Sequence, residues 1–129
     1  MQRADHDLAF MLQYENVAWC DAGAVKILDR RVYPGRVEFV TCRTHVEVMQ
    51  AIRDMVTQSA GPYTAAGMGM ALAAWECREK PEKEQLAFLQ QAAACIADAR
   101  PTTKKRMEQV CIGCLAAAKQ ALKAGARVD

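Results

Sequence analysis

Residues 62–77 read Pro-Tyr-Thr-Ala-Ala-Gly-Met-Gly-Met-Ala-Leu-Ala-Ala-Trp-Glu-Cys, and this stretch decides the fold. Pro62 suits the first turn of a helix, and alanine, leucine and methionine favour its continuation. Each glycine inside a helix costs about 1 kcal/mol relative to alanine. A helix that carries Gly67 and Gly69 among so many alanines is therefore expected to lie deep in the molecule, with the backbone of a neighbour close against it.

Further helices are expected on both sides of this stretch. Thr44-His45-Val46-Glu47 has the form of a capping box, in which the hydroxyl and the carboxylate each accept from a free backbone amide. Val48, Ile52 and Met55 follow at the spacing of one helix face. Proline, glycine and threonine then separate the later helical segments. The sequence predicts four helices, near residues 44–57, 62–78, 82–99 and 103–124.

The chain before residue 43 has a different character. Ala24-Val25-Lys26-Ile27-Leu28 and residues 37–42 are rich in β-branched and apolar residues, and Pro34-Gly35 is a turn dipeptide between them. A shorter strand is expected at residues 17–19. The predicted fold class is α+β with helix dominant, in a single domain of residues 1–129. An antiparallel meander (1–43) packs on a helical bundle (44–129), because so few strands are marginally stable alone.

Composition excludes several classes of function. The 129 residues are 52% hydrophobic and 25% charged, with a formal net charge of +2, which is ordinary for a soluble globular domain. Such a balance gives no argument for a nucleic-acid or membrane partner. Asp5 and Asp7 stand where a secretory signal would carry basic residues. The expected compartment is the cytoplasm.

Cysteine and histidine give weak signals. Cys111 and Cys114 form a C-x-x-C, but a zinc site of this type needs a second ligand pair, which the sequence lacks. Both thiols are predicted to be buried and metal-free, with a cysteine-based metal or redox protein as the alternative. His6 and His45 are expected at the surface, without a nucleophile nearby. We therefore assign no catalytic residue, no metal ligand and no cofactor.

A cluster of cations surrounds the predicted start of the last helix. Arg100 is followed by Lys104-Lys105-Arg106. The common interpretation of such a run is a solvated face. The sharper one is a phosphate site, because free amides at a helix start and an arginine side chain both bind anions.

The motifs together resemble a known family. Their order and spacing, over about residues 12–122, are similar to those of the N-terminal domain of the methylthioribose-1-phosphate isomerases. That superfamily includes the regulatory subunits of initiation factor 2B and ribose-1,5-bisphosphate isomerase. The segments that carry the resemblance are Val17-Ala18-Trp19, Ile27-Leu28-Asp29, Tyr33-Pro34, residues 51–56, residues 65–74 and Ala99-Arg100-Pro101-Thr102.

The resemblance implies a sugar-phosphate site, but only some of the family's phosphate-binding residues are present in this sequence. Arg100 matches the second phosphate-binding arginine of the family, and Thr102 and Lys104 lie beside it in sequence. The stretch at residues 57–62 has no arginine where the family has its first one. The family's catalytic cysteine and aspartate belong to a C-terminal Rossmann-like domain that this sequence does not match.

The resemblance therefore implies an isolated or severed N-terminal domain. The parent activity would be that of a sugar-phosphate aldose–ketose isomerase of methionine salvage, and the domain alone would be inactive. Its expected partners are a Rossmann-like catalytic domain or a second copy of itself, and a sugar phosphate. The alternative is an independent protein-interaction or regulatory module.

Overall fold

The structure is a computed structural model that describes residue 10 and residues 13–125. It confirms the predicted helix-dominated α+β fold. The helices and strands follow one another in the order α1 (Tyr14–Val17), β1 (Ala18–Asp21), β2 (Ala24–Leu28), β3 (Phe39–Cys42), α2 (His45–Arg53), α3 (Gly61–Glu76), α4 (Glu82–Ala97), the 3₁₀ turn η2 (Pro101–Thr103) and α5 (Lys104–Lys123). The sequence patterns did not indicate α1 or η2.

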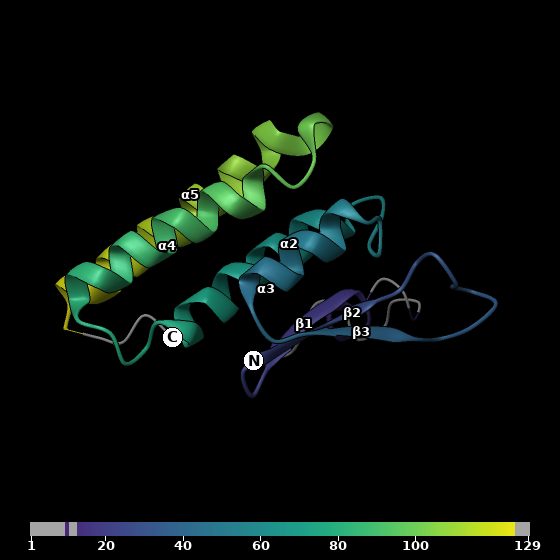
Figure 1. Ribbon diagram of the computed structural model, residues 1–129, viewed down its shortest axis with the longest axis horizontal. Coiled ribbons are helices and arrows are strands. Elements are labelled where there is room, and N and C mark those ends of the chain that lie inside the picture. Colours follow the sequence, from purple (N-terminus) through teal and green to yellow (C-terminus); the bar gives the residue numbers. More distant parts are fainter. Residues whose placement is uncertain (1–9, 11–12, 126–129) are drawn as a thin grey trace.

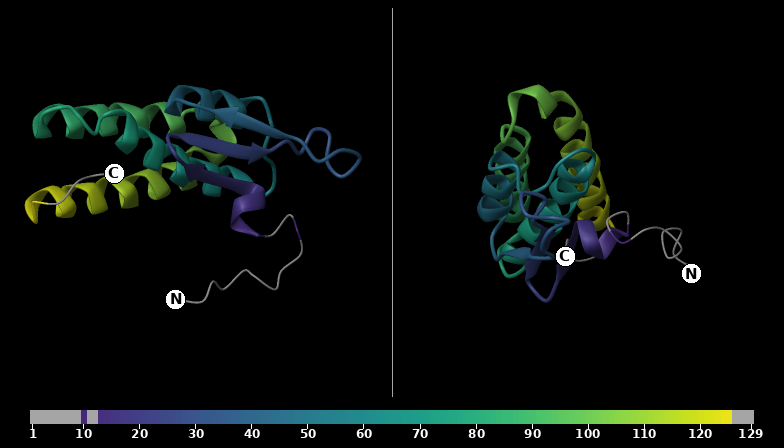
Figure 2. Two further views of the ribbon diagram at one scale, coloured as in Figure 1. Left: turned by 90° about the horizontal axis from the view of Figure 1, so that it is seen from below. Right: turned by 90° about the vertical axis from the view of Figure 1, so that its right-hand side faces the viewer.

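These elements form three layers (Figure 1). The sheet is the first layer, α2 and α3 form the second, and α4 with α5 forms the third. The strands pair antiparallel in the order β1-β2-β3, which confirms the predicted meander. Within the described part of the chain, α2 to α5 all lie on one side of this sheet, so its strands lie in front when the molecule is viewed from below (Figure 2, left).

The alternation of side chains along the strands explains which face is covered. Val25 and Ile27 on β2, with Cys42 on β3, are buried against the helices. Trp19 lies opposite Lys26, and Lys26 lies opposite Thr41, in one row across the other face. Because successive residues of a strand point to opposite faces, the apolar set enters the core and this row stays outside.

The glycine-rich helix α3 occupies the centre, in contact with β1, α2, α4 and α5. A Cβ atom added at Gly69 would lie 2.9 Å from Cγ1 of Val48 and 3.0 Å from Cδ1 of Ile96. The expected close neighbour is therefore present at Gly69, although it consists of side chains from two helices rather than of backbone. At Gly67 the prediction was wrong, because an added Cβ would meet no atom within 4 Å.

Helix α2 begins as predicted and ends early. The hydroxyl of Thr44 accepts from the backbone N–H of Glu47 at 3.2 Å, and Val48 and Ile52 are buried. The helix ends at Arg53, because Met55 adopts a left-handed backbone conformation with φ +64°. Met55 is consequently 47% exposed and does not extend the buried face of α2.

None of the helices within the described part of the chain combines the length and apolar character needed to cross a membrane.

Candidate functional site

Arg100 fastens the connection between α4 and α5 to the end of α2. Its backbone is extended before Pro101, as a residue preceding proline should be. The guanidinium donates from Nε to the carbonyl of Ile52 and from Nη2 to the carbonyl of Thr57, both at 2.7 Å. Burial lowers the pKa of Arg100, yet a guanidinium stays charged at neutral pH. The cation is thus held in a fixed position at the carboxyl end of α2, where the helix dipole favours it.

Arg100 binds the connection between α2 and α3, whose backbone contains two left-handed residues. Thr57 is buried, and the neighbouring carbonyl of Val56 accepts from the backbone N–H of Arg30 at 2.7 Å. Met55 and Ser59 both have left-handed backbone conformations, with φ +64° and +60°. Non-glycine residues in this region carry strain, and strained residues cluster at binding sites. The connection between α2 and α3 is therefore a tightly held and strained segment.

The other two predicted site residues lie near Arg100 with different surroundings. Thr102 is exposed in η2. Nζ of Lys104 lies 2.9 Å from Oδ1 of Asp98, and this contact raises the pKa of Lys104. An anion bound here would compete with Asp98 for the ammonium group. The phosphate site thus stays a prediction. In this site Arg100 is held by two backbone carbonyls, and Lys104 would have to bind both Asp98 and the anion.

Two helix starts meet at this end of the molecule. The guanidinium of Arg106, in the first turn of α5, lies 5.5 Å from the ring centre of Tyr63, in the first turn of α3. Neither helix has a side-chain cap, since Ala60 and Thr103 make no capping hydrogen bond. Uncapped amides at neighbouring helix starts, next to a fixed arginine, form an arrangement suited to binding an anion.

His45 is buried, so its predicted surface position was wrong. Its exposed fraction is 9%, and its Nδ1 lies 3.0 Å from Oε1 of Glu76. The same carboxylate oxygen accepts from the backbone N–H of His45 at 2.6 Å, and the ring of Phe88 meets the imidazole edge-on. Glu76 thereby ties the start of α2 to the end of α3. His6 lies outside the described residues.

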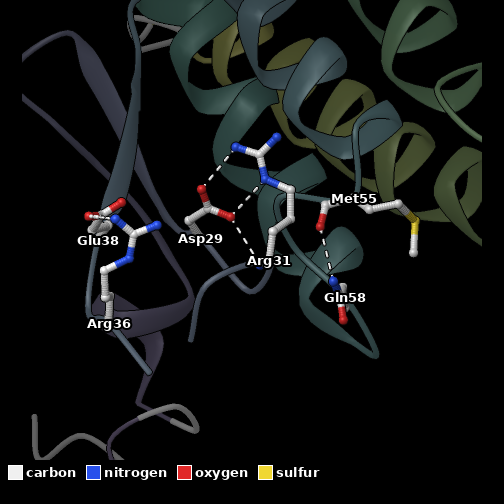
Figure 3. A network of polar contacts seen from close by, with 6 residues as sticks. All are labelled: Asp29, Arg31, Arg36, Glu38, Met55 and Gln58. Carbon is white, nitrogen blue, oxygen red and sulfur yellow. Dashed lines mark hydrogen bonds and ion pairs between the residues drawn. The ribbon is translucent and has the colours of Figure 1, made fainter. Parts of the chain in front are cut away.

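A second polar network holds the long connection between β2 and β3 (Figure 3). The buried carboxylate of Asp29 accepts from the backbone N–H of Arg31 at 3.0 Å and from its Nε and Nη2, each at 2.9 Å. These hydrogen bonds lower the pKa of Asp29. Sequence inspection overlooked this pair, although an aspartate that binds the amide two residues later is a readable turn signal. The network is internal to the loop, which favours a structural role.

The C-x-x-C cysteines lie within α5 and differ in burial. Cys111 is buried as predicted, and burial raises the pKa of its thiol to about 11. Cys114 is only half-buried, because it borders a groove opposite Gly67, which has no side chain to cover it. Among the described residues, no group of three histidine, cysteine or acidic side chains is placed to hold a metal ion.

Cys111 should react with a thiol reagent at least 100-fold more slowly in the native protein than in the unfolded chain. At pH 8 a thiol of pKa about 11 is ionised in roughly one molecule in a thousand, against about a quarter for a free cysteine. Pulse labelling followed by peptide mass spectrometry, with and without urea, measures both rates. Equal rates in the two states would contradict the burial of Cys111.

Comparison with known proteins places this arrangement in context. No protein-family model matches the chain. A methylthioribose-1-phosphate isomerase of Natranaerobius thermophilus is 40% identical over 80 residues, which make up 59% of this chain and 22% of that protein. An isomerase of the same name from Cereibacter sphaeroides is 37% identical over 87 residues, 65% of this chain and 22% of that protein. The chain is a relative of the methylthioribose-1-phosphate isomerases.

Solved structures agree with this relationship. The 5-methylthioribose 1-phosphate isomerase of Pyrococcus horikoshii shares the fold over 81% of this chain and 30% of that one, with a TM-score of 0.72 and 22% identity. Subunit delta of translation initiation factor eIF-2B from A. fulgidus matches 81% of this chain and 31% of that one, with a TM-score of 0.72 and 28% identity. These matches confirm the resemblance seen in the sequence. The chain spans roughly a quarter of the length of the methylthioribose-1-phosphate isomerases that it matches.

Proposed function

We propose that this chain is the N-terminal domain of a methylthioribose-1-phosphate isomerase-like protein, and that it does not catalyse isomerisation alone. The observation that carries the proposal is the identity of 37–40% to isomerases of that name over about 60% of the chain. The proposed partner is a Rossmann-like catalytic domain, with self-association as a further mode of assembly. The proposed setting is methionine salvage in the cytoplasm.

The chemistry of the reaction supports the non-catalytic part of the proposal. Aldose–ketose isomerisation moves a proton between adjacent carbons and needs a positioned acid and base. Among the described residues, the closest histidine–carboxylate pair is His45 with Glu76, and this pair joins the start of α2 to the end of α3. The role of this pair is to hold the two helices together, and the Glu76 carboxylate already accepts two hydrogen bonds from His45.

The contribution we propose for the domain is to help hold the substrate phosphate. Arg100 would supply N–H donors beyond the two that Ile52 and Thr57 accept, since a guanidinium has five. The amides of η2 and of the first turn of α5 would face the same anion, with Thr102 and Lys104 at the rim. Without a second domain to exclude water and salt, binding would be weak, with a dissociation constant in the millimolar range, on the order of 4 kcal/mol.

An NMR titration of the chain with methylthioribose-1-phosphate at low salt tests the site. We expect amide shifts at residues 57–63 and 100–105, with weaker binding in Lys104→Gln and unchanged binding in the matched control Lys119→Gln. Arg100→Lys keeps the charge and loses the planar fork, and it should also weaken binding. Shifts spread over all surface lysines, or no shifts, would exclude the site.

The catalytic half of the proposal is tested separately by measuring ketose phosphate formation. The purified chain should give no turnover above a protein-free blank. Turnover that co-purifies with the chain and is lost in Arg100→Lys would contradict the proposal.

A further inference from the structure

The outward side of α5 carries no charge over about three turns. Helix α5 packs on α3 and α4, and its other side lies on the outside of the molecule (Figure 2). Residues 109–118 all have uncharged side chains. Six exposed residues follow the spacing of one helix face, and we call this set the outer face of α5: Gln109, Ile112, Gly113, Ala116, Ala117 and Gln120.

The outer face of α5 differs from an ordinary exposed helix face, which carries charged and polar side chains. Ile112 is 62% exposed, the largest exposed fraction among the large apolar side chains in the described part of the chain. A Cβ atom added at Gly113 would meet no atom within 4 Å, so the backbone of α5 is open to a neighbour at this point. Glycine and alanine around one isoleucine let a second helix pack closely, at the axial distance of about 8–10 Å found in helix pairs.

A groove of about 180 Å³ borders this face, between α5 and α3. It opens where Gly67 of α3 has no side chain, and Ala117 belongs both to its wall and to the outer face of α5. Met70 and Leu89 also line it, and none of its lining residues is charged. Small-molecule sites measure about 300–1,000 Å³, whereas an apolar cavity of about 150 Å³ holds one benzene ring. The groove therefore has the size for a single large apolar side chain.

Cations stand at both ends of the outer face. Lys105 and Arg106 lie in the turn that precedes it, and Lys119 and Lys123 lie at its other end. The three lysines form no ion pair or side-chain hydrogen bond with another described residue. Helix α5 holds five basic residues and one acidic residue, Glu108, in a chain whose formal net charge is only +2. This surface is complementary to a segment that carries carboxylates on both sides of an apolar centre.

The same charges argue against a second copy of this chain as the occupant. Antiparallel packing of two α5 helices would bring the basic start of each against the basic end of the other, and parallel packing would bring equal ends together. Juxtaposed like charges oppose association. An anionic membrane would meet the charge requirement, but helices that lie in a membrane surface present large apolar residues such as tryptophan, phenylalanine and leucine. The outer face has one isoleucine among small residues, which favours a protein.

We propose that the outer face of α5 and the adjoining groove bind an acidic amphipathic helix of a partner protein. One leucine- or phenylalanine-sized side chain of that helix enters the groove at Gly67, and its carboxylates pair with the lysines of α5. Lys105 and Lys123 are about 27 Å apart along the helix, which sets the separation of the two acidic ends of the partner. The surface is separate from the proposed phosphate site at Arg100 and does not depend on isomerase activity.

The probe is a labelled synthetic helix of about 20 residues, with leucines on one face and glutamates in its first and last turns. Fluorescence anisotropy measures its affinity for the purified chain, and amide NMR shifts map its position. We expect saturable binding, with shifts at residues 67–74 and 105–123. The same peptide with lysine in place of every glutamate should bind at least about tenfold more weakly, because its ends meet like charges.

A first variant tests the groove. Gly67→Leu places a side chain where an added Cβ meets open space, so the fold should persist while the groove is filled. We expect the affinity for the acidic peptide to fall at least about tenfold. The matched control is Thr41→Leu, which adds a leucine at an exposed position of the sheet, separated from α5 by the layer of α2 and α3 (Figure 1). The control should leave the affinity unchanged.

A second variant tests the charges. Lys119→Gln combined with Lys123→Gln should weaken the acidic peptide at least about tenfold and should leave the affinity for methylthioribose-1-phosphate unchanged. Lys26→Gln combined with Arg43→Gln removes the same charge from exposed positions of the sheet. This control should change the affinity less than about twofold, since exposed charges beyond about 10 Å are screened.

Four results would overturn the proposal. The first three are no saturable binding, equal affinity for the acidic and basic peptides, and unchanged affinity in Gly67→Leu. The fourth is dimerisation of the chain in analytical ultracentrifugation that Ala116→Glu abolishes, because a second copy would then occupy the surface. Binding to phosphatidylglycerol vesicles without binding to the peptide would likewise overturn it in favour of a membrane surface.

Discussion

Arg100→Ala should lower the free energy of unfolding by about 2–4 kcal/mol. The substitution removes two short hydrogen bonds from a charged donor and leaves the carbonyls of Ile52 and Thr57 without that partner. It also removes a cation from the carboxyl end of α2, where the helix dipole favours one. Since small domains have a total stability of about 5–15 kcal/mol, the loss should be plain in urea denaturation followed by circular dichroism.

Controls separate this anchoring from a general loss of surface charge. Lys105→Ala lies in the same basic run and is exposed, so it should change the stability by less than about 0.5 kcal/mol. Arg100→Lys should fall between the two, because an ammonium group cannot reach both carbonyls with the same planar geometry. A loss below about 0.5 kcal/mol in Arg100→Ala would mean that water replaces the guanidinium at both carbonyls.

The same substitution at two neighbouring glycines should have opposite effects. Gly69→Leu should destabilise the protein by about 3 kcal/mol, because its first carbon already meets Val48 and Ile96 at about 3 Å and the rest has no space. Gly67→Leu should stabilise it by up to about 1 kcal/mol, since leucine is a better helix former and an added Cβ meets open space.

Thermal or urea unfolding of the two variants beside wild type measures the difference. The pair controls for helix propensity, because both positions lie inside α3 and receive the same residue. Similar changes of the same sign would show that the close approach of α2 and α4 to Gly69 is not a constraint.

The sequence predicted elements whose signals are local. Residues 24–28 form a strand with the predicted bounds, because apolar residues in alternation lie between two turns. Thr44 caps α2 through a contact three residues away. The end of α2 was predicted wrongly because Met55 continues the apolar spacing, whereas the backbone turns left-handed there. The spacing of apolar residues indicates which face of a helix is buried. It does not indicate the residue at which the helix ends.

The candidate site was only partly predictable, since its contacts are distant in sequence. Arg100 was identified through a motif, but its partners are backbone carbonyls 43 and 48 residues earlier, and no side-chain pattern encodes them. His45 was misplaced because its partner Glu76 lies 31 residues later.

The central position of α3 has a consequence for how the protein is made. The sheet and α2 precede α3 in the chain, whereas α4 and α5, which cover its other side, follow it. During synthesis the chain emerges amino end first, so the side of α3 that carries Met70 and Ala74, next to Leu89 of α4 and Cys114 of α5, waits uncovered until both later helices have left the ribosome. Nascent chains that stop within α4 would display this apolar surface, which makes them the expected clients of chaperones and proteases.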